Sequence, residues 1–269
     1  MSALGSTPVD ELTRAIRAAG DRALGWFRRP LDIDDKGTGH RFDPVTDADR
    51  TVEAILRREI GARYPGDAIL GEEEGLTGSG DRCWIIDPID GTRSFVSGQP
   101  LWGTLVGLRV GDDVVAGWNH LPALGETYVA ADGTAQLLER DGSRRSLATS
   151  ATADLSQAIV GCTHPAMFPT PNERSAFGAI ADAVRMVRFG GDCANYGLVA
   201  LGTMDLVIEG GLHPYDIAAH IPIIEAAGGV VIGLAGSSRT NPADGGFVIT
   251  AANQALADAA IELAAAHLG

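Results

Sequence analysis

The chain has 269 residues, of which 45% are hydrophobic and 21% charged, a composition that can bury a sizeable core in one large domain or two closely packed ones. The net charge of −14 argues against nucleic acid and anionic membranes as general partners. Three cysteines without metal-ligand spacing, no basic-then-apolar leader and no apolar run of about 20 residues predict a soluble, cytoplasmic protein.

The first half predicts two helices followed by short strands. Thr7 and Pro8 are typical of a helix start, and apolar residues then recur at helical spacing from Val9 to Phe27. A second helical pattern has Val52, Ile55, Leu56 and Ile60 on one face. The apolar runs after it predict strands at Ala68–Leu70, Arg82–Ile86, Leu101–Val110, Val114–Trp118, Glu126–Ala131 and Ala135–Glu139.

From about Ala158 the pattern alternates between strands and helices. The expected strands lie near Ala158–Gly161, Met186–Phe189, Asp205–Glu209, Val230–Gly233 and Phe247–Thr250. The expected helices follow Asn172 and Asp192, cover Asp216–Ala227 and begin again at Asn253. The order predicts an α+β fold with an α/β second half, divided into an α+β domain at 1–150 and an α/β domain at 151–269.

Residues 83 to 92 read Cys-Trp-Ile-Ile-Asp-Pro-Ile-Asp-Gly-Thr and carry the main functional signal. The apolar run delivers Asp87 and Asp90 into a turn that Pro88 and Gly91 force out of regular structure. A buried carboxylate needs a compensating cation, and clusters of carboxylate oxygens suit Mg²⁺. The other interpretation is an Asx turn, in which the two aspartates only cap local backbone amides.

Three more acidic segments are candidates to join this turn. In Gly71-Glu72-Glu73-Glu74, Glu72 sits where a predicted strand ends, although an acidic run is usually a solvated loop. Asp43-Pro44-Val45-Thr46-Asp47-Ala48-Asp49 leads into the second helix. His213-Pro214-Tyr215-Asp216 precedes a later helix, and Asp216 alone is typical of a helix N-cap.

Taken in order, these four segments resemble the inositol monophosphatase family of metal-dependent phosphatases. The family pattern is Asp-x-Val-Thr-x-x-Asp, then Gly-Glu-Glu, then Asp-Pro-Ile-Asp-Gly-Thr, then an aromatic residue and Asp, and it spans Asp43 to Asp216 here. The resemblance implies a layered αβαβα sandwich of the inositol monophosphatase and fructose-1,6-bisphosphatase type. It also implies a homodimer, for which the apolar strands of the first half are candidate interface elements.

The resemblance further implies a metal site. Glu72, Asp87 and the Ile89 carbonyl would bind one Mg²⁺, and Asp87, Asp90 and Asp216 another, with two or three ions per site and Mn²⁺ as a possible substitute. Two ions about 3.5–4 Å apart can polarise a phosphate, generate hydroxide and stabilise the leaving alkoxide.

Catalysis, by the same resemblance, needs no covalent phospho-enzyme. Asp49 and Thr92 would together orient the water that attacks phosphorus, and Glu72 would assist from the metal site. The alternative is a purely structural role for each residue. Thr92 would be a helix cap, and Asp49 would be an acid in the first turn of a helix, where the helix dipole favours it. Asp43 and Asp47 are expected to be structural caps, and Glu73 to be structural.

Substrate contacts are expected from Asp90, Gly91, Thr92 and Asp216 at the phosphate end, and from Asp192 and Glu209 at the leaving alcohol. Two acids at that end favour a substrate with an ammonium and an imidazole group, which matches L-histidinol phosphate. The segments around Trp102, Asp192 and Asp216 also resemble the histidinol-phosphatase branch. The alternatives without substrate contact are a helix N-cap for Asp192 and a carboxylate at the rim of the site for Glu209.

Two other functions remain open at this point. An inositol-1-monophosphatase, or a broad sugar or polyol phosphatase, would use the same metal site, with Glu209 accepting hydrogen bonds from hydroxyl groups. A non-catalytic regulatory protein would keep the fold for binding, but the intact set of acids and the acidic charge argue against it.

Overall fold

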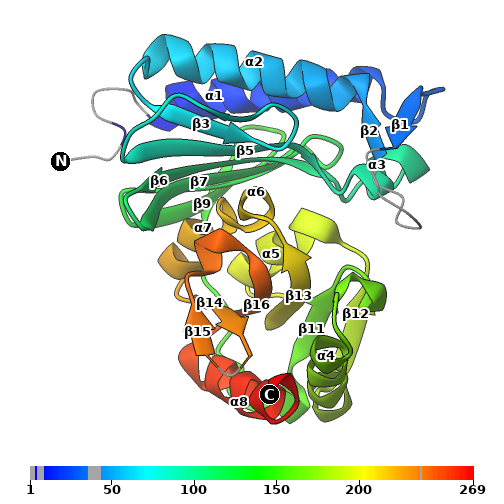
Figure 1. Cartoon of the computed structure of the whole chain (residues 1–269). Helices are drawn as coiled ribbons and strands as arrows, with labels where there is room; N and C mark the ends of the chain where they lie inside the picture. The colour runs from blue at the N-terminus through cyan, green and yellow to red at the C-terminus, as the bar shows by residue number, and fades with distance from the viewer. Residues whose placement is uncertain (1–3, 5–8, 36–43, 237) are drawn as a thin grey trace.

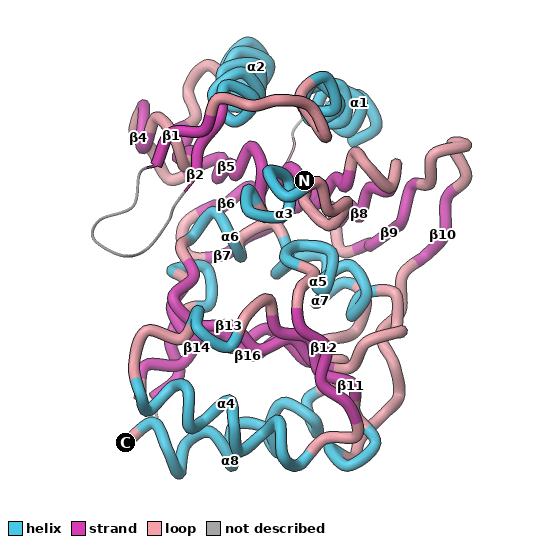
Figure 2. The backbone as a smooth tube through the Cα atoms, turned by 90° about the vertical axis from the view of Figure 1, so that its right-hand side faces the viewer, coloured by secondary structure: helices cyan, strands magenta, loops and turns pink. Residues whose placement is uncertain are grey.

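The computed structural model describes residues 4, 9–35, 44–236 and 238–269, and its elements stack in five alternating layers (Figure 1). The three helical layers are, in order through the stack, α1 (Val9–Gly20) with α2 (Asp47–Arg63), then α5 (Asp192–Ala200), α6 (Pro214–Ile217) and α7 (His220–Ala226), then α4 (Pro171–Ala183) with α8 (Gln254–Leu268). A sheet lies between each pair of helical layers (Figure 2). The predicted layered αβαβα sandwich is therefore confirmed.

The first sheet has eight strands. Their spatial order is β10 (Arg144–Ser146), β9 (Thr134–Leu138), β8 (Glu126–Ala131), β7 (Asp113–Leu121), β6 (Gly103–Val110), β5 (Arg82–Asp90), β3 (Ala68–Gly71) and β4 (Gly75–Thr77). All neighbours are antiparallel except β3 and β5, which pair in parallel with Gly71 opposite Ile86. Because the two strands run in the same direction, Glu72, which directly follows β3, comes beside Asp87 of β5.

The second sheet has six strands. Their spatial order is β12 (Met186–Phe189), β11 (Ile159–Cys162), β13 (Leu206–Leu212), β16 (Gly246–Ala251), β14 (Val230–Ala235) and β15 (Ser238–Thr240). The smaller elements are β1 (Ile33–Asp35), β2 (Pro44–Thr46), the short helix α3 (Thr92–Ser97) and the 3₁₀ turns η1 (Asp21–Gly25), η2 (Leu155–Gln157), η3 (Pro165–Met167) and η4 (Pro242–Asp244).

The apolar faces predicted for the first two helices pack against the first sheet. Leu12, Ile16, Val52, Leu56 and Ile60 are at most 1% exposed and lie in one core with tryptophans of β5 and β7. Thr7 and Pro8 lie outside the described residues, so the predicted start of the first helix has no structural counterpart here. None of the described helices has both the length and the apolar composition that crossing a membrane requires.

Two sequence-based boundaries were wrong. The strand that carries the aspartates continues through Asp90 as β5, with a register shift against β6 between Asp87 and Asp90, instead of ending in a turn. The helix expected at Asp216–Ala227 is two helices, α6 and α7. Pro222 explains the break, because it has no N–H to donate to the carbonyl four residues earlier.

Helices of the chain cover both faces of the central strands of the first sheet. Side chains of β5 to β9 are buried on one side against α1 and α2 and on the other against α5 and α7. The expectation that strands of the first half supply a dimer interface stays a prediction. The division into domains at residue 150 stays a prediction, since α5 and α7 share one core cluster with both sheets.

The middle helices approach the first sheet backbone to backbone. Gly107 of β6 and Gly117 of β7 lie opposite each other in register. A Cβ atom on Gly117 would lie 2.1 Å from the Ala219 carbonyl oxygen, and one on Gly107 would lie 3.1 Å from the Ala218 Cβ. These two glycines thus let the segment between α6 and α7 rest on the sheet that carries Asp87.

Replacing Gly117 with alanine should destabilise the fold by about 1–3 kcal/mol, because the added methyl group overpacks a backbone contact. Gly61→Ala in α2 is the matched control, since a Cβ there meets nothing within 4 Å. We expect Gly61→Ala to be neutral or stabilising by up to about 1 kcal/mol. Urea unfolding of both variants measures the difference, and equal stabilities would contradict the close approach.

Candidate active site

Three carboxylates from two distant segments meet where β5 ends and α6 begins. One oxygen each of Asp87, Asp90 and Asp216 lies within 4.8 Å of the others, the spacing that a shared cation requires. Asp87 is 2% exposed, and the other two are half-buried. The structure thus brings together three of the four acids predicted to bind metal.

Each of these acids also accepts a hydrogen bond from a nearby amide. Asp87 Oδ1 accepts from Ile89 N at 3.0 Å, the geometry of an Asx turn, and Asp90 Oδ2 accepts from Cys193 N at 2.8 Å. Asp216 Oδ2 accepts from His213 N at 2.6 Å. Asp216 is therefore the third residue of a helix whose N-cap is His213, and not an N-cap itself. Asp87, Asp90 and Asp216 therefore accept local backbone hydrogen bonds and at the same time form the acidic cluster.

Burial and mutual repulsion dominate the electrostatics of this cluster. Burial first, and then the charges of Glu72, Asp90, Asp216 and Asp49, raise the pKa of Asp87 well above its usual range. Burial, and then the charges of Asp192 and Asp216, raise the pKa of Asp90 in the same way. Carboxylates held this close stay ionised only with a cation among them.

Glu72 lies in the turn between β3 and β4. Its backbone N–H donates to the Ile86 carbonyl at 3.2 Å, one residue before Asp87. After burial, the charge of Glu72 is the largest cause of the raised pKa of Asp87. The metal roles of Glu72 and of the Ile89 carbonyl stay predictions.

Asp49 is buried in the first turn of α2, close enough for its charge to act on Asp87. Its Oδ2 accepts from Thr46 N at 2.8 Å and from Thr46 Oγ1 at 2.6 Å, whereas its Oδ1 is buried and has no hydrogen-bond partner within the described residues. Burial raises the pKa of Asp49 to about 6. An orphaned, buried carboxylate oxygen fits a site that takes up a cation or an ordered water.

Asp49 and Thr92 share no direct hydrogen bond in the described part of the chain. The Thr92 hydroxyl donates instead to the Ile89 carbonyl at 3.0 Å. Their joint role in orienting water stays a prediction. Asp43 and Asp47 were expected to be structural caps. Asp43 lies outside the described residues. Asp47 does not cap α2, because Thr46 is the N-cap; Asp47 is exposed and forms an ion pair with Arg50.

A cavity of about 670 Å³ opens beside the cluster. Its wall includes all six residues predicted to contact substrate, which are Asp90, Gly91, Thr92, Asp192, Glu209 and Asp216. The cluster beside it offers carboxylate oxygens, and these carboxylates repel one another. Both features fit Mg²⁺, which prefers oxygen ligands.

Asp192 and Glu209 lie on the second-half side of the cavity. Asp192 is the first residue of α5, with Gly191 as the N-cap, and its Oδ2 accepts from Ser94 Oγ at 2.5 Å. Glu209 is 3% exposed, which contradicts the rim position considered for it. It accepts from Thr163 N at 3.0 Å and from Tyr196 Oη at 2.8 Å. Burial raises the pKa of Glu209 to about 7.

Sequence reasoning missed several residues of the site. Arg93 and Tyr196 line the cavity, and Glu53 lies beneath the turn of Glu72. Tyr196 lies one helical turn after Asp192, a spacing that could have placed it on the same face. Glu53 follows Asp49 by four residues on the apolar face of α2, and an acid on such a face is itself a signal.

Comparison with known proteins agrees with this geometry. The family model described as the inositol monophosphatase family matches residues 6–268. The chain belongs to the inositol monophosphatase family. It is similar to a protein named histidinol-phosphatase from Chlorobaculum parvum, with 38% identity over 239 residues that cover 87% of this chain and 88% of the relative. It is also similar to an inositol-1-monophosphatase from Synechocystis, with 34% identity over 81% of this chain and 76% of the relative.

A solved structure supports the same assignment. The chain superposes on an inositol monophosphatase from Zymomonas mobilis with a TM-score of 0.81 and 35% identity, covering 95% of this chain and 97% of the other. The predicted family and layered fold are thereby confirmed.

The raised pKa values predict how stability depends on pH in the absence of divalent ions. The folded chain keeps protons on Asp49, Asp87, Asp90 and Glu209 that the unfolded chain releases. Stability should therefore fall as the pH rises from about 4 through these raised values. A divalent cation replaces the protons, so it should stabilise the protein more at about pH 8 than at about pH 5.5.

Thermal unfolding with and without Mg²⁺ at the two pH values measures this difference. Mg²⁺ at about 100 times its Kd adds about 2.7 kcal/mol. For a chain of this size, that energy corresponds to a rise in Tm of about 5–10 °C. An equal shift at both pH values would contradict a site whose ligands must lose protons to bind.

Proposed function

We propose that this protein is a Mg²⁺-dependent phosphatase that hydrolyses L-histidinol phosphate to L-histidinol and phosphate. Membership of a phosphatase family makes it a phosphoric monoester hydrolase. The observation that carries the choice of substrate is the pair of acids, Asp192 and Glu209, in the cavity that opens beside the carboxylate cluster.

Glu72, Asp87, the Ile89 carbonyl, Asp90 and Asp216 are the residues that would hold the metal. Bound Mg²⁺ would supply positive charge to the phosphate oxygens and lower the pKa of water. Burial of Asp87 keeps bulk water away from this point, and the amide hydrogen bonds of the aspartates keep their orientation fixed.

Asp49 and Thr92 are proposed to prepare the attacking water. The orphaned Oδ1 of Asp49 is an acceptor for a proton, and the pKa of about 6 that burial gives this carboxyl lies close to neutral pH. The Thr92 oxygen can accept a hydrogen bond from the same water while its hydroxyl group donates to the Ile89 carbonyl. Phosphate would lie against Asp90, Gly91 and Thr92, which line the cavity.

The second-half wall of the cavity suits a cationic leaving group. Asp192 and Glu209 both belong to it, and each acid is oriented by a neutral donor, Ser94 for the first and Tyr196 for the second. A substrate ammonium or imidazolium would therefore meet carboxylates that retain free acceptor capacity. Charge-assisted hydrogen bonds of this kind are about twice as strong as neutral ones.

The second candidate is an inositol-1-monophosphatase or a broader sugar or polyol phosphatase. It is supported by the relative of that name and by the same two acids, because carboxylates also accept hydrogen bonds from hydroxyl groups. A regulatory protein without activity is less well supported, because the acid set is intact and clustered.

Phosphate release from purified protein tests the assignment. With Mg²⁺ present, L-histidinol phosphate should be hydrolysed at least about tenfold more efficiently than inositol 1-phosphate, a difference of about 1.4 kcal/mol in transition-state binding. EDTA should abolish both activities. Faster hydrolysis of inositol 1-phosphate would overturn the choice of substrate and leave the phosphatase assignment standing.

Asp192→Asn separates the two candidates more directly. Loss of one charge-assisted hydrogen bond costs about 1.5–3 kcal/mol, so kcat/KM for L-histidinol phosphate should fall roughly 10- to 100-fold. The neutral amide still pairs with hydroxyl groups, so a polyol phosphate should lose much less. Ser94→Ala is the control, because it removes the partner of Asp192 and keeps the charge. Equal losses for both substrates would contradict recognition of a cation.

The homodimer and the cytoplasmic location stay predictions. All three cysteines are free thiols, in agreement with a reducing compartment. Sedimentation velocity of the purified protein measures the oligomeric state.

A further inference from the structure

Glu53 is a buried acid outside the metal-binding set. It lies in the middle of α2 with a fully buried side chain, between apolar residues of the helix face that packs on the sheet. A buried carboxylate is costly unless hydrogen bonds and a counter-charge satisfy it. Its partners therefore indicate what it is for.

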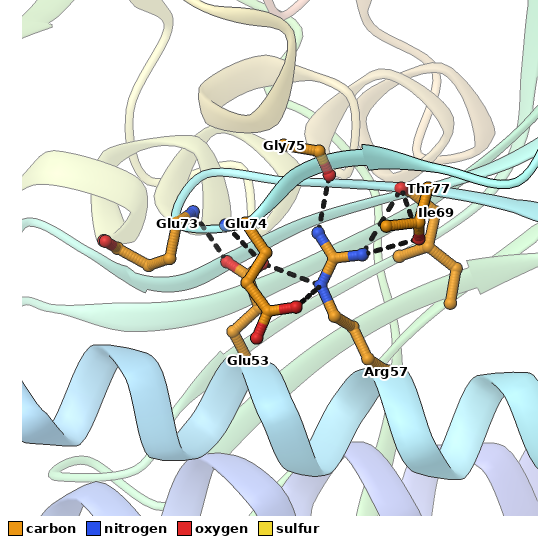
Figure 3. Close-up of polar contacts among 7 residues, drawn as sticks. All are labelled: Glu53, Arg57, Ile69, Glu73, Glu74, Gly75 and Thr77. Carbon is orange, nitrogen blue, oxygen red and sulfur yellow. Dashed lines mark hydrogen bonds and ion pairs between the residues drawn. The ribbon is translucent and has the colours of Figure 1, made fainter.

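The partners of Glu53 are one arginine and the backbone of residues 72–74, which form the acidic turn between β3 and β4 (Figure 3). Its Oε2 accepts from Glu73 N at 2.8 Å, and its Oε1 accepts from Glu74 N at 3.0 Å. Oε1 also accepts from Arg57 Nε at 2.8 Å, one helical turn further along α2. One side chain of α2 thus fixes the two amides that directly follow Glu72.

Arg57 extends the same contact to both strands that flank the turn (Figure 3). It donates to the Gly75 carbonyl at 2.6 Å and to Thr77 Oγ1 at 2.9 Å, both in β4, and to the Ile69 carbonyl of β3 at 3.5 Å. Its side chain is only 10% exposed. Strands β3 and β4 are therefore both tied to α2.

Gly71 provides the space for this arrangement. A Cβ atom there would lie 2.2 Å from Glu53 Oε1 and 2.7 Å from Arg57 Nη2. The residue before Glu72 therefore has to be glycine for the two side chains to reach the turn. On the other side, Glu72 N donates to the Ile86 carbonyl next to Asp87. The backbone around Glu72 is thus held from both α2 and β5.

We propose that Glu53, together with Arg57, is a positioning residue that holds the carboxylate of Glu72 toward Asp87 for metal binding. The proposal rests on the metal site of the proposed function. Glu53 does not touch the metal or the substrate; it acts through the amides of Glu73 and Glu74. Residues that orient metal ligands in this way change metal affinity by about 10- to 100-fold when they are replaced.

Glu53→Gln is the test variant. The amide keeps the size of the side chain, but its NH₂ group faces a backbone N–H or the guanidinium, so one hydrogen bond is replaced by two opposed donors. We expect the Kd for Mn²⁺, measured by electron paramagnetic resonance without substrate, to rise about tenfold or more. Amides 73 and 74 should also exchange faster with deuterium in the metal-free protein.

Glu59→Gln is the matched control. Glu59 forms the same kind of pair on the same helix, with Arg63 four residues later at 2.9 Å, and its hydrogen-bond partners do not include the acidic turn. Its removal should leave Mn²⁺ affinity unchanged. Because the defect of Glu53→Gln lies in metal affinity, saturating Mg²⁺ should restore most of its kcat, which a general loss of folding would not allow.

A lower Tm with unchanged Mn²⁺ affinity would show that Glu53 only stabilises the fold and would overturn the proposal. Should Glu53→Gln fail to fold, Arg57→Lys is the second variant. It keeps the positive charge beside Glu53 but loses the guanidinium hydrogen bonds to the Gly75 carbonyl and to Thr77 Oγ1. It should weaken Mn²⁺ binding in the same direction, and unchanged affinity would overturn the proposal. Absence of Mn²⁺ binding to the wild-type chain would instead refute the metal site, and with it the proposed function.

Discussion

The feature on which this structure depends is the repulsion between carboxylates that the fold holds together away from bulk water. Asp87 is almost fully buried, and the largest influences on it after burial are other acids. Left without a cation, such a cluster raises the pKa of its members and destabilises the folded chain. The arrangement therefore makes physical sense as a receptor for divalent cations, and it explains why part of the acidic charge of the chain is compatible with an anionic substrate.

Four acids at this site are oriented in the same way, by a hydrogen bond from a backbone N–H. Asp49, Asp87, Asp90 and Asp216 each use one oxygen to accept a backbone N–H, from Thr46, Ile89, Cys193 and His213 respectively. That hydrogen bond fixes the side chain without neutralising it. Glu72 is fixed differently, since its backbone is held by β5 and the amides that follow it are held by Glu53. Three of the four carboxylates that accept local backbone hydrogen bonds are thus the same ones that form the acidic cluster.

The layers of the fold bring these residues together from distant parts of the sequence. The parallel pairing of β3 and β5 places Glu72 beside Asp87, and the glycines of β6 and β7 let the segment after Asp216 rest on the same sheet. The N-terminus of α5 then meets Asp90 through Cys193 and places Asp192 in the cavity wall. The first half thus supplies Asp87 and Asp90 of the cluster, and the second half supplies Asp216 and most of the cavity wall.

The sequence by itself determined the layered fold, most strands and the identity of the clustered acids, because periodicity and the four motifs are local signals that residues carry along the chain. Only the tertiary structure decided that the predicted helix at Asp216–Ala227 is split, that Thr46 and not Asp47 caps α2, and that Glu209 is buried. It also decided the role of Glu53, which in the sequence is one more acid of a helix. These properties depend on partners that are remote in the sequence, such as the amides of Glu73 and Glu74, and no local pattern encodes which remote groups a side chain meets.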